Sequence, residues 1–255
     1  MEETILVCDD SFVGIFTGVY EAYARKLHHE LTRIQIGKEE NLRLFAEYIV
    51  IEPSEEKTVK VSRTLQKRLG EEVYNTLCRA LASKDSQKGD TVYHTIVLAL
   101  GEKGNKVMEN LQNDYVRKVF ELSRYVWGEI HHLYGFLRFE EMENGVLFSK
   151  IGPKNNIITF LAPHFSERFP TENYIIFDET RNVYAVHPAR NQWFLVTGDE
   201  FARDLSNRYS DKELEIQELF RYFCHKIAIK ERINPSLQRN MLPIRFREYM
   251  TEFQQ

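Results

Sequence analysis

Three short stretches and the C-terminal tail place basic or amide side chains where they could bind phosphate. In the first stretch, Arg138 shares one face of a predicted strand with Phe136 and Glu140, because alternate residues of a strand point the same way. An arginine beside an aromatic ring can hold a phosphate or stack on a base. The alternative is a cross-strand ion pair of Arg138 with Glu140 or Glu141.

The second stretch, Pro153-Lys154-Asn155-Asn156, stands directly before a predicted helix. Unbonded backbone N–H groups and the positive end of the helix dipole meet at such a position, and Lys154 adds charge. The stretch is therefore suited to an anion. An ordinary asparagine N-cap is the alternative.

The third stretch closes the same predicted helix with His164 and Arg168. These residues stand four apart and therefore share one face of the helix. A face of this kind could contact phosphate. The alternative is that both side chains only complement the negative end of the helix dipole.

The C-terminal tail is basic and aromatic on an otherwise acidic chain. The net charge of the 255 residues is −4, whereas a protein that grips nucleic acid with its whole surface is usually basic. Any contact must therefore come from a local patch, although a solvated helix face would show the same pattern. The cations and rings that predict this patch are Arg221, Tyr222, Phe223, Lys226, Lys230, Arg232, Arg239, Arg245, Phe246, Arg247 and Tyr249.

The sequence contains no motif for a cofactor or a metal. Cys8, Cys78 and Cys224 lie far apart, which indicates free thiols in a reducing compartment. This spacing also excludes an iron–sulfur cluster ligated by this chain alone. The histidines lack the helical spacing with a carboxylate that metal sites show. We therefore expect neither a cofactor nor a metal.

Acidic residues leave an enzymatic function open. Asp9 and Asp10 follow the first predicted strand at its carboxyl end, where open sheets often bear function, although they also suit a helix cap. Candidates for general acid–base work in a hydrolase or lyase acting on nucleic acid are Asp9, Asp10, Glu140, Glu141, His164 and Asp178.

The apolar periodicity predicts an α+β fold. The opening is predicted as β-α-β-β, a helical middle follows, and a β-β-α-β-β-β antiparallel sheet comes next. Asn144-Gly145 predicts a tight hairpin between strands at 136–139 and 146–151. A helix from Asp211 and an irregular, proline-containing tail follow.

Two lobes are expected, 1–133 and 134–255, packed together because no flexible linker separates them. Met1-Glu2-Glu3 is acidic where a signal peptide would be basic. No apolar run approaches the roughly 20 residues that span a bilayer. A cytoplasmic protein without membrane contact is therefore expected.

Several segments together resemble one bacterial family that is associated with DNA repair or DNA metabolism and whose biochemical activity is unknown. The likeness spans nearly the full chain and keeps the order of the motifs. It is carried by Cys8-Asp9-Asp10-Ser11-Phe12 with Gly14, Gly135-Phe136-Leu137-Arg138-Phe139, Pro153-Lys154-Asn155-Asn156, Pro163-His164-Phe165 with Arg168, and Lys230-Glu231-Arg232 with Asn234-Pro235, Leu237-Gln238 and Pro243.

The resemblance implies a protein partner, a radical-SAM protein encoded beside this one, which would carry the cluster cysteines. Related domains occur fused ahead of a uracil-DNA-glycosylase domain, which we do not find in this sequence. Neither enzyme activity is therefore expected of this chain. The family tail usually continues with a Tyr-Trp type pair, where this sequence has Pro243-Ile244-Arg245-Phe246-Arg247.

We therefore predict an accessory protein of DNA repair or DNA metabolism that binds nucleic acid, a radical-SAM partner, or both. The alternatives are a hydrolase or lyase acting on nucleic acid and a pure protein-interaction adaptor. The predicted nucleic-acid-binding residues are Arg138, Lys154, Asn155, Asn156, His164, Arg168, Lys230, Arg232, Asn234, Gln238, Arg239 and Arg245.

Overall fold

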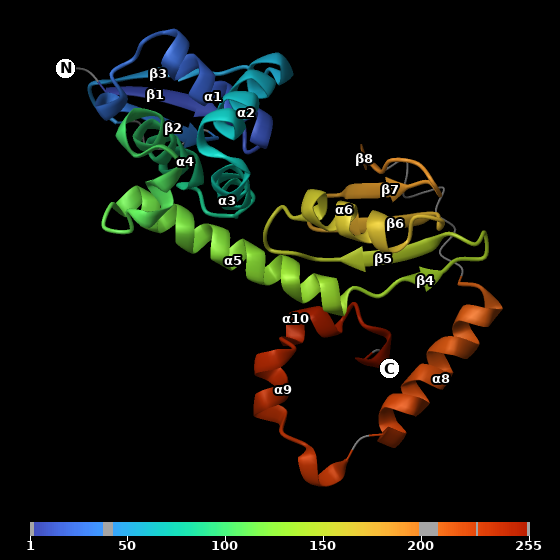
Figure 1. Ribbon diagram of the computed structural model, residues 1–255. Helices are drawn as coiled ribbons and strands as arrows, with labels where there is room; N and C mark the ends of the chain where they lie inside the picture. Colours follow the sequence, from blue (N-terminus) through green and yellow to red (C-terminus); the bar gives the residue numbers. More distant parts are fainter. Residues whose placement is uncertain (1–2, 38–42, 199–208, 228, 254–255) are drawn as a thin grey trace. The chain divides into compact units, whose positions relative to one another are not determined.

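The computed structural model describes residues 3–37, 43–198, 209–227 and 229–253, without the side chains of residues 102, 103 and 230. The chain forms two compact units, residues 1–128 and 129–255, and the division falls within the long helix α5 (Asp114–Phe136). Each unit contains helices and its own sheet (Figure 1), so the predicted α+β class is confirmed.

The first unit is built around a three-stranded parallel sheet with the order β2-β1-β3. The strands are β1 (Glu3–Cys8), β2 (Thr32–Ile36) and β3 (Ala46–Val50). Helix α1 (Phe12–Ala24) links β1 to β2, and its N-cap Ser11 accepts a hydrogen bond from the Gly14 N–H at 2.9 Å. The predicted β-α-β-β opening is thus confirmed.

A glycine lets α1 pack closely on the sheet. A Cβ atom on Gly18 would lie only 2.5 Å from the Sγ atom of Cys8 at the end of β1. Any larger residue would therefore push α1 away from the strand. The buried side chains of Ile15, Phe16 and Val19 fill the interface that this close approach creates.

The remaining helices of the first unit surround its core, whose largest fully buried side chains include Phe16, Leu65, Leu77, Tyr93 and Ile96. These elements are α2 (Glu55–Leu69), α3 (Glu71–Leu81), α4 (Lys88–Leu98), a π-helical turn (Ala99–Lys103), two 3₁₀ turns (His29–Leu31 and Gly104–Glu109) and the first part of α5.

Helix α4 packs along β2, which is an edge strand of this sheet. The backbone N–H of Ile34 in β2 donates to Asp90 Oδ1 on α4 at 3.2 Å. Asp90 also accepts from Arg33 Nη1 at 3.0 Å. One carboxylate therefore satisfies both a backbone donor and a side chain of the same strand.

The second unit contains a five-stranded sheet with the order β4-β5-β6-β7-β8. The strands are β4 (Glu140–Glu141), β5 (Leu147–Ile151), β6 (Tyr174–Asp178), β7 (Val183–His187) and β8 (Phe194–Thr197). Between β4 and β5 the chain turns at Gly145, which has a φ of +77° and donates to Met142 O at 2.8 Å. The predicted turn at Asn144-Gly145 is confirmed, but the strand that enters it is β4 and not residues 136–139.

Two details of this sheet correct the sequence-based expectation. The sheet is mixed, because β5 and β6 run parallel and α6 (Ile158–Arg168) forms the crossover between them. The expected strand at 136–139 is also absent from this described stretch, since α5 continues through Phe136 and Leu137 N still donates to Leu133 O. Burial of Leu133 and Leu137 outweighs the cost of about 1 kcal/mol that Gly135 brings to the helix.

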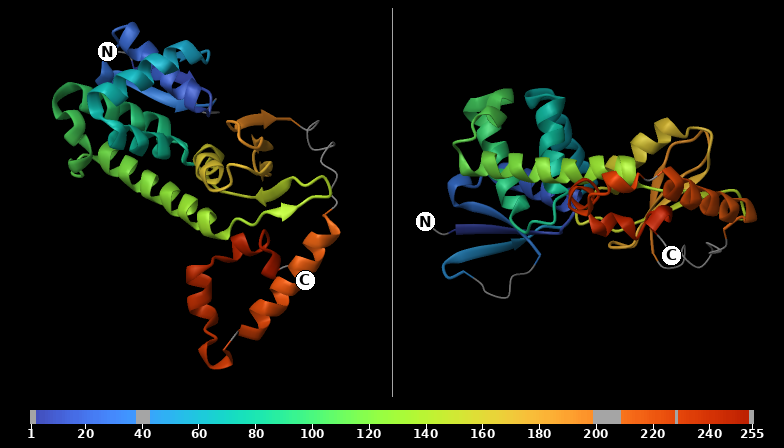
Figure 2. Two further views of the ribbon diagram at one scale, coloured as in Figure 1. Left: turned by 45° about the vertical axis from the view of Figure 1, so that its right-hand side comes forward. Right: turned by 90° about the horizontal axis from the view of Figure 1, so that it is seen from below.

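The tail of the second unit forms helices that first lead away from its sheet and then return to the end of α5 (Figures 1 and 2). They are α8 (Asp211–Ile227), a 3₁₀ turn (Lys230–Arg232), α9 (Pro235–Met241), α10 (Ile244–Arg247) and a 3₁₀ turn (Thr251–Phe253). Among the described residues, no helix combines the length and the apolarity needed to cross a bilayer.

Candidate functional site

A buried carboxylate occupies the predicted anion-binding loop before α6. Glu129 Oε1 accepts from the Lys154 N–H at 3.0 Å, and Oε2 accepts from the Asn155 N–H at 3.0 Å and from Asn155 Nδ2 at 2.6 Å. The guanidinium of Arg245 lies 3.0 Å from Oε1. Glu129 and Asn155 are both buried. The anion held by this loop is therefore a side chain of the protein itself.

The other side of the loop is fixed by Arg181. Its guanidinium donates to Pro153 O at 3.1 Å, to Lys154 O at 2.8 Å and to Asp178 Oδ2 at 3.1 Å. Asp178 is buried, and this burial raises the pKa of its carboxyl above the ordinary value although Arg181 opposes the shift. These contacts give the loop a fixed backbone between two charged side chains.

The end of the chain closes over Gly152 in the same loop. A Cβ atom on Gly152 would lie 2.1 Å from the hydroxyl oxygen of Tyr249. That hydroxyl donates to the carboxylate of Glu179, which also pairs with Lys150 at 2.5 Å. Burial, and then the hydrogen bond to Glu179, raises the pKa of Tyr249. The tail is thus fastened to the loop at Tyr249 as well as at Arg245.

Arg138 is also paired with a carboxylate. Its Nη2 lies 2.8 Å from Glu252 Oε1, and its Nη1 donates to Gly135 O at 2.9 Å. Arg138 therefore pairs with the tail and not with Glu140 or Glu141, the partners that the alternative interpretation named. Like Arg245, Arg138 is neutralised within the unit.

Of the predicted cations near α6, Lys154 and Arg168 face outward. Both side chains are exposed, and neither forms an ion pair with any described residue. Arg168 lies over the Phe169 ring at 5.8 Å, and Asn156 is exposed beside Lys154. The His164 ring stacks on Tyr134 with 3.9 Å between centroids. His164 therefore packs against an aromatic ring, whereas Arg168 keeps its charge free.

The predicted residues of the tail have different surroundings. Asn234 caps α9, because its Oδ1 accepts from the Leu237 N–H at 3.0 Å. Arg232, Gln238 and Arg239 are exposed, and Arg239 Nε donates to Pro235 O at 3.2 Å. The side chain of Lys230 lies outside the described residues. Figures 1 and 2 show α9 well apart from α6, so the structure does not gather all the predicted cations on one surface.

Helix α8 exposes an apolar stripe that charge-based reasoning missed. The side chains of Leu219 and Phe223 are 67% and 53% exposed. Their neighbours on the same face have the i, i+3, i+4, i+7 spacing that normally faces a core. We call this row the α8 stripe, and its members are Ile216, Leu219, Phe220, Phe223 and Ile227. A second exposed row follows on and around α9 and consists of Ile233, Leu237, Met241 and Ile244.

Residues 86–252 match the sequence model of DUF4130, a domain of unknown function. The chain belongs to the DUF4130 family. No curated protein matches the chain. The DUF4130 domain begins just before α4, so β1, β2 and β3 precede it. It includes α5 with Glu129, the second sheet, the loop before α6 and the α8 stripe.

Several of the acidic candidates have their own partners within their units. Asp10 pairs with the buried amine of Lys88 at 2.6 Å, in the first unit. Glu140, in the DUF4130 domain, accepts from Gln217 Nε2 at 3.3 Å, and burial raises its pKa. Asp178 holds Arg181, as described above. Among the described residues, no three His, Cys, Asp or Glu side chains are grouped so that they could hold a metal ion.

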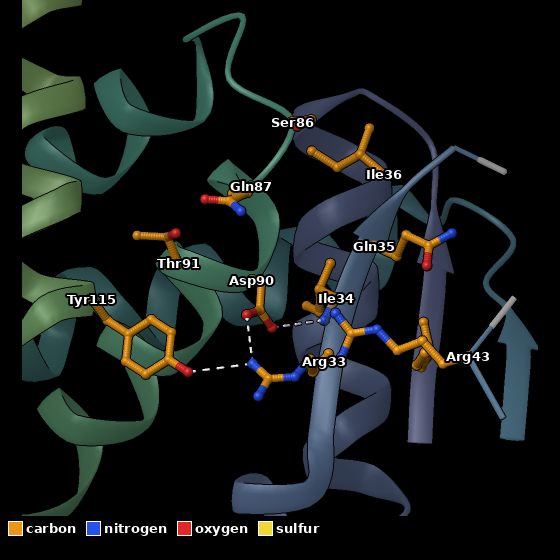
Figure 3. A pocket seen from close by; sticks show the side chains of 11 residues that line it. Arg33, Ile34, Gln35, Ile36, Arg43, Ser86, Gln87, Asp90, Thr91 and Tyr115 are labelled. Atoms are coloured by element: carbon orange, nitrogen blue, oxygen red, sulfur yellow. Dashed lines mark hydrogen bonds and ion pairs between the residues drawn. The ribbon is translucent and has the colours of Figure 1, made fainter. Parts of the chain in front are cut away.

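A polar pocket of about 570 Å³ lies beside β2 in the first unit (Figure 3). Arg33 points from β2 toward Asp90 of α4 and donates to the Tyr115 hydroxyl at 3.3 Å. It also pairs with Glu3 at 2.7 Å, and Glu3 pairs with Arg43 at 3.1 Å. The carboxylates of Glu3 and Asp90 balance the charges of the two guanidiniums in this network. We therefore interpret the network as a structural link between β2 and α4.

Glu129 is the central residue that sequence reasoning missed. A signal for it exists, because Glu129 lies three residues after Val126 and four before Leu133, both buried on the apolar face of α5. A carboxylate on the apolar face of a helix becomes buried, and a buried carboxylate needs a cation or hydrogen-bond donors beside it. The α8 stripe is likewise readable as an amphipathic pattern, but a pattern alone does not say whether the protein covers it.

Proposed function

We propose that this protein is an accessory factor of DNA repair or DNA metabolism that docks onto a protein partner through the exposed stripe of α8. The observation that carries this proposal is the exposure of five large apolar side chains on one helical face. An apolar face of this size normally packs against a core or a binding partner, because each square ångström removed from water contributes roughly 25 cal/mol.

The chemistry of the stripe favours a protein over nucleic acid as its ligand. Phe220 and Phe223 are the aromatic anchors that protein interfaces concentrate at their centre. Nucleic acid would need cations along the same face, whereas most charged residues of α8 lie off the stripe and its N-terminal half is acidic. An apolar groove or helix of a partner fits the stripe better.

The family resemblance supports a radical-SAM protein as the partner in this proposal. Such an enzyme carries its own iron–sulfur cluster, and two of the three thiols of this chain are poorly placed for that task. Cys8 and Cys78 are largely enclosed in the first unit, and burial raises the pKa of each thiol to about 12. The reactive chemistry would therefore belong to the partner, and this chain would position it.

We also propose nucleic-acid contact, but through fewer residues than the sequence analysis predicted. Arg138 and Arg245 bind carboxylates inside the unit, and Asn155 is buried against Glu129. Of the predicted cations whose side chains the structure describes, Lys154, Arg168, Arg232 and Arg239 keep a free charge toward solvent. We assign phosphate contact to these four residues, two beside α6 and two on or near α9.

The test is co-purification of the tagged full chain with the radical-SAM protein encoded beside it. Leu219→Glu with Phe223→Glu places two charges on the α8 stripe, and we expect at least a tenfold loss of bound partner. The matched control is Leu214→Glu with Tyr222→Glu, since these side chains are 49% and 60% exposed on the same helix but lie off the stripe.

Both double variants should keep the helix, because they add glutamate to exposed helical positions. Nuclease treatment should leave the complex intact. Equal recovery of the partner with both double variants would contradict docking through the stripe. Release of the partner by nuclease would show that nucleic acid, and not α8, joins the two proteins.

A further inference from the structure

A pocket of about 530 Å³ lies at the C-terminal end of α6, beside the turn that joins β7 to β8. Its lining includes Glu167 from α6, His187 from the end of β7, and Arg190, Asn191, Gln192 and Trp193 from the turn. Pockets of this volume accommodate a mononucleotide. The pocket lies within the second unit and is formed without any residue of α8 or α9.

Backbone hydrogen bonds fix the turn that forms one wall. Arg190 N donates to Pro170 O at 2.7 Å, Asn191 N donates to Pro188 O at 3.0 Å, and Ala189 N donates to Asn173 Oδ1 at 2.9 Å. Arg190 has a φ of +62°, in the left-handed region that a non-glycine residue adopts only at a cost of the order of 1 kcal/mol. A turn held in this way is preformed for binding.

The side chains of the pocket divide into engaged and free groups. His187 Nδ1 lies 3.0 Å from Glu172 O, and its ring stacks on Tyr174 with 4.7 Å between centroids. By contrast, no hydrogen bond or ion pair to a described residue engages the side chains of Glu167, Arg190 and Gln192. The pocket therefore offers a carboxylate, a guanidinium and an amide beside one indole ring.

We propose that this pocket binds a guanine nucleotide, either free or as a guanine of a single strand. The indole of Trp193 provides a stacking surface, which contributes roughly 1–3 kcal/mol per base. The Watson–Crick edge of guanine carries two adjacent donors, N1–H and the N2 amino group, and the carboxylate of Glu167 accepts both. Arg190 binds the phosphate, and the amide of Gln192 donates to O6.

The carboxylate of Glu167 makes the pocket prefer guanine to adenine and cytosine. Adenine presents an acceptor at N1 where guanine presents a donor, so Glu167 would face a lone pair instead of an N–H group. Cytosine offers one amino donor beside an acceptor. Although Glu167 is exposed, a base that cannot donate to its carboxylate forfeits both hydrogen bonds of this edge and therefore binds more weakly. Guanine should therefore bind at least tenfold more tightly than adenine or cytosine.

The chain contains two tryptophans, so Trp127→Phe makes Trp193 the sole indole reporter. In this background, GMP should quench Trp193 fluorescence with saturation, and AMP and CMP should need at least tenfold higher concentrations. Glu167→Gln should remove most of the preference for GMP over AMP while AMP binding stays unchanged. Glu143→Gln, an exposed carboxylate elsewhere in the unit, is the matched control.

Two further arms identify the source of the guanine and the role of Arg190. A short deoxythymidine strand with one central dG, compared with GMP, distinguishes a strand from a free nucleotide. Arg190→Gln should weaken GMP binding roughly tenfold but leave guanosine binding unchanged. Absence of saturable quenching by both GMP and the dG strand would overturn the proposal, as would equal affinity for GMP and AMP. Because no partner is present, either result leaves docking through α8 unaffected.

Discussion

The carboxylate of Glu129 and the guanidinium of Arg245 form an ion pair of 3.0 Å, although Glu129 belongs to α5 and Arg245 to α10 in the tail. The acidic partner is buried and also receives the backbone N–H groups of Lys154 and Asn155. A single side chain therefore joins a helix, a loop and the tail.

Replacing Glu129 should destabilise the second unit strongly. Glu129→Gln keeps the size of the side chain but leaves Arg245 partly buried without its charge partner, which costs about 3 kcal/mol. Urea unfolding followed by Trp193 fluorescence, in a Trp127→Phe background, reports this unit. Glu143→Gln should change the free energy of unfolding by less than about 0.5 kcal/mol. Equal midpoints for the two variants would contradict the anchoring role of Glu129.

Nucleic-acid binding should depend on the free cations of the tail. Arg232→Ala with Arg239→Ala should weaken binding to a single-stranded oligonucleotide, and should reduce the slope of log K against log salt by about 1.4, since each lost phosphate contact contributes about 0.7. The matched control is Arg63→Ala with Arg68→Ala, two exposed arginines of α2 in the first unit. If the wild-type chain shows no binding at low salt, with or without the partner, direct contact is ruled out.

The first unit should lose stability as the pH falls below about 6.5. Burial lowers the pKa of His29 from its ordinary value of 6.5, and the charge of His94 acts in the same direction. Between the lowered and the ordinary value, the unfolded chain binds a proton that the folded chain does not. Stability therefore rises with pH through this window and is lost on acidification.

The substitution His29→Gln tests this pH dependence, because glutamine keeps a polar group near the Tyr93 hydroxyl, 2.6 Å from His29 Nδ1, without titrating. The difference in unfolding temperature between pH 7 and pH 5.5 should become smaller. His28→Gln changes the neighbouring exposed histidine and should leave that difference as in the wild type. An unchanged difference in the His29 variant would contradict this assignment and place the acid sensitivity on other groups.

Local patterns predicted the elements of this fold well. Ser11, directly after Asp9 and Asp10, caps α1, and Asn113 caps the long helix α5 by accepting from the Tyr115 and Val116 N–H groups. The Asn-Gly hairpin was also predictable, because its backbone conformation depends on two adjacent residues. Signals of this kind lie within a few residues of the structure that they specify.

Contacts between distant residues were not predictable in the same way. The sequence showed that the loop before α6 could hold an anion, but the anion is Glu129, which no local pattern connects to Lys154 or Arg245. The parallel pairing of β5 with β6 follows from the path of α6 across the sheet. Whether a cation meets a carboxylate, as Arg138 meets Glu252, depends on tertiary packing and not on local charge.

The hydrogen bond from Ile34 to Asp90 has a consequence for self-association. An open edge of a sheet is a template on which another chain can add a strand and begin to aggregate. On β2, the central outward N–H is already taken by a charged acceptor from α4, and the helix lies along that edge. A strand from another molecule would have to displace the Asp90 carboxylate and helix α4, so this edge is closed to intermolecular strand addition.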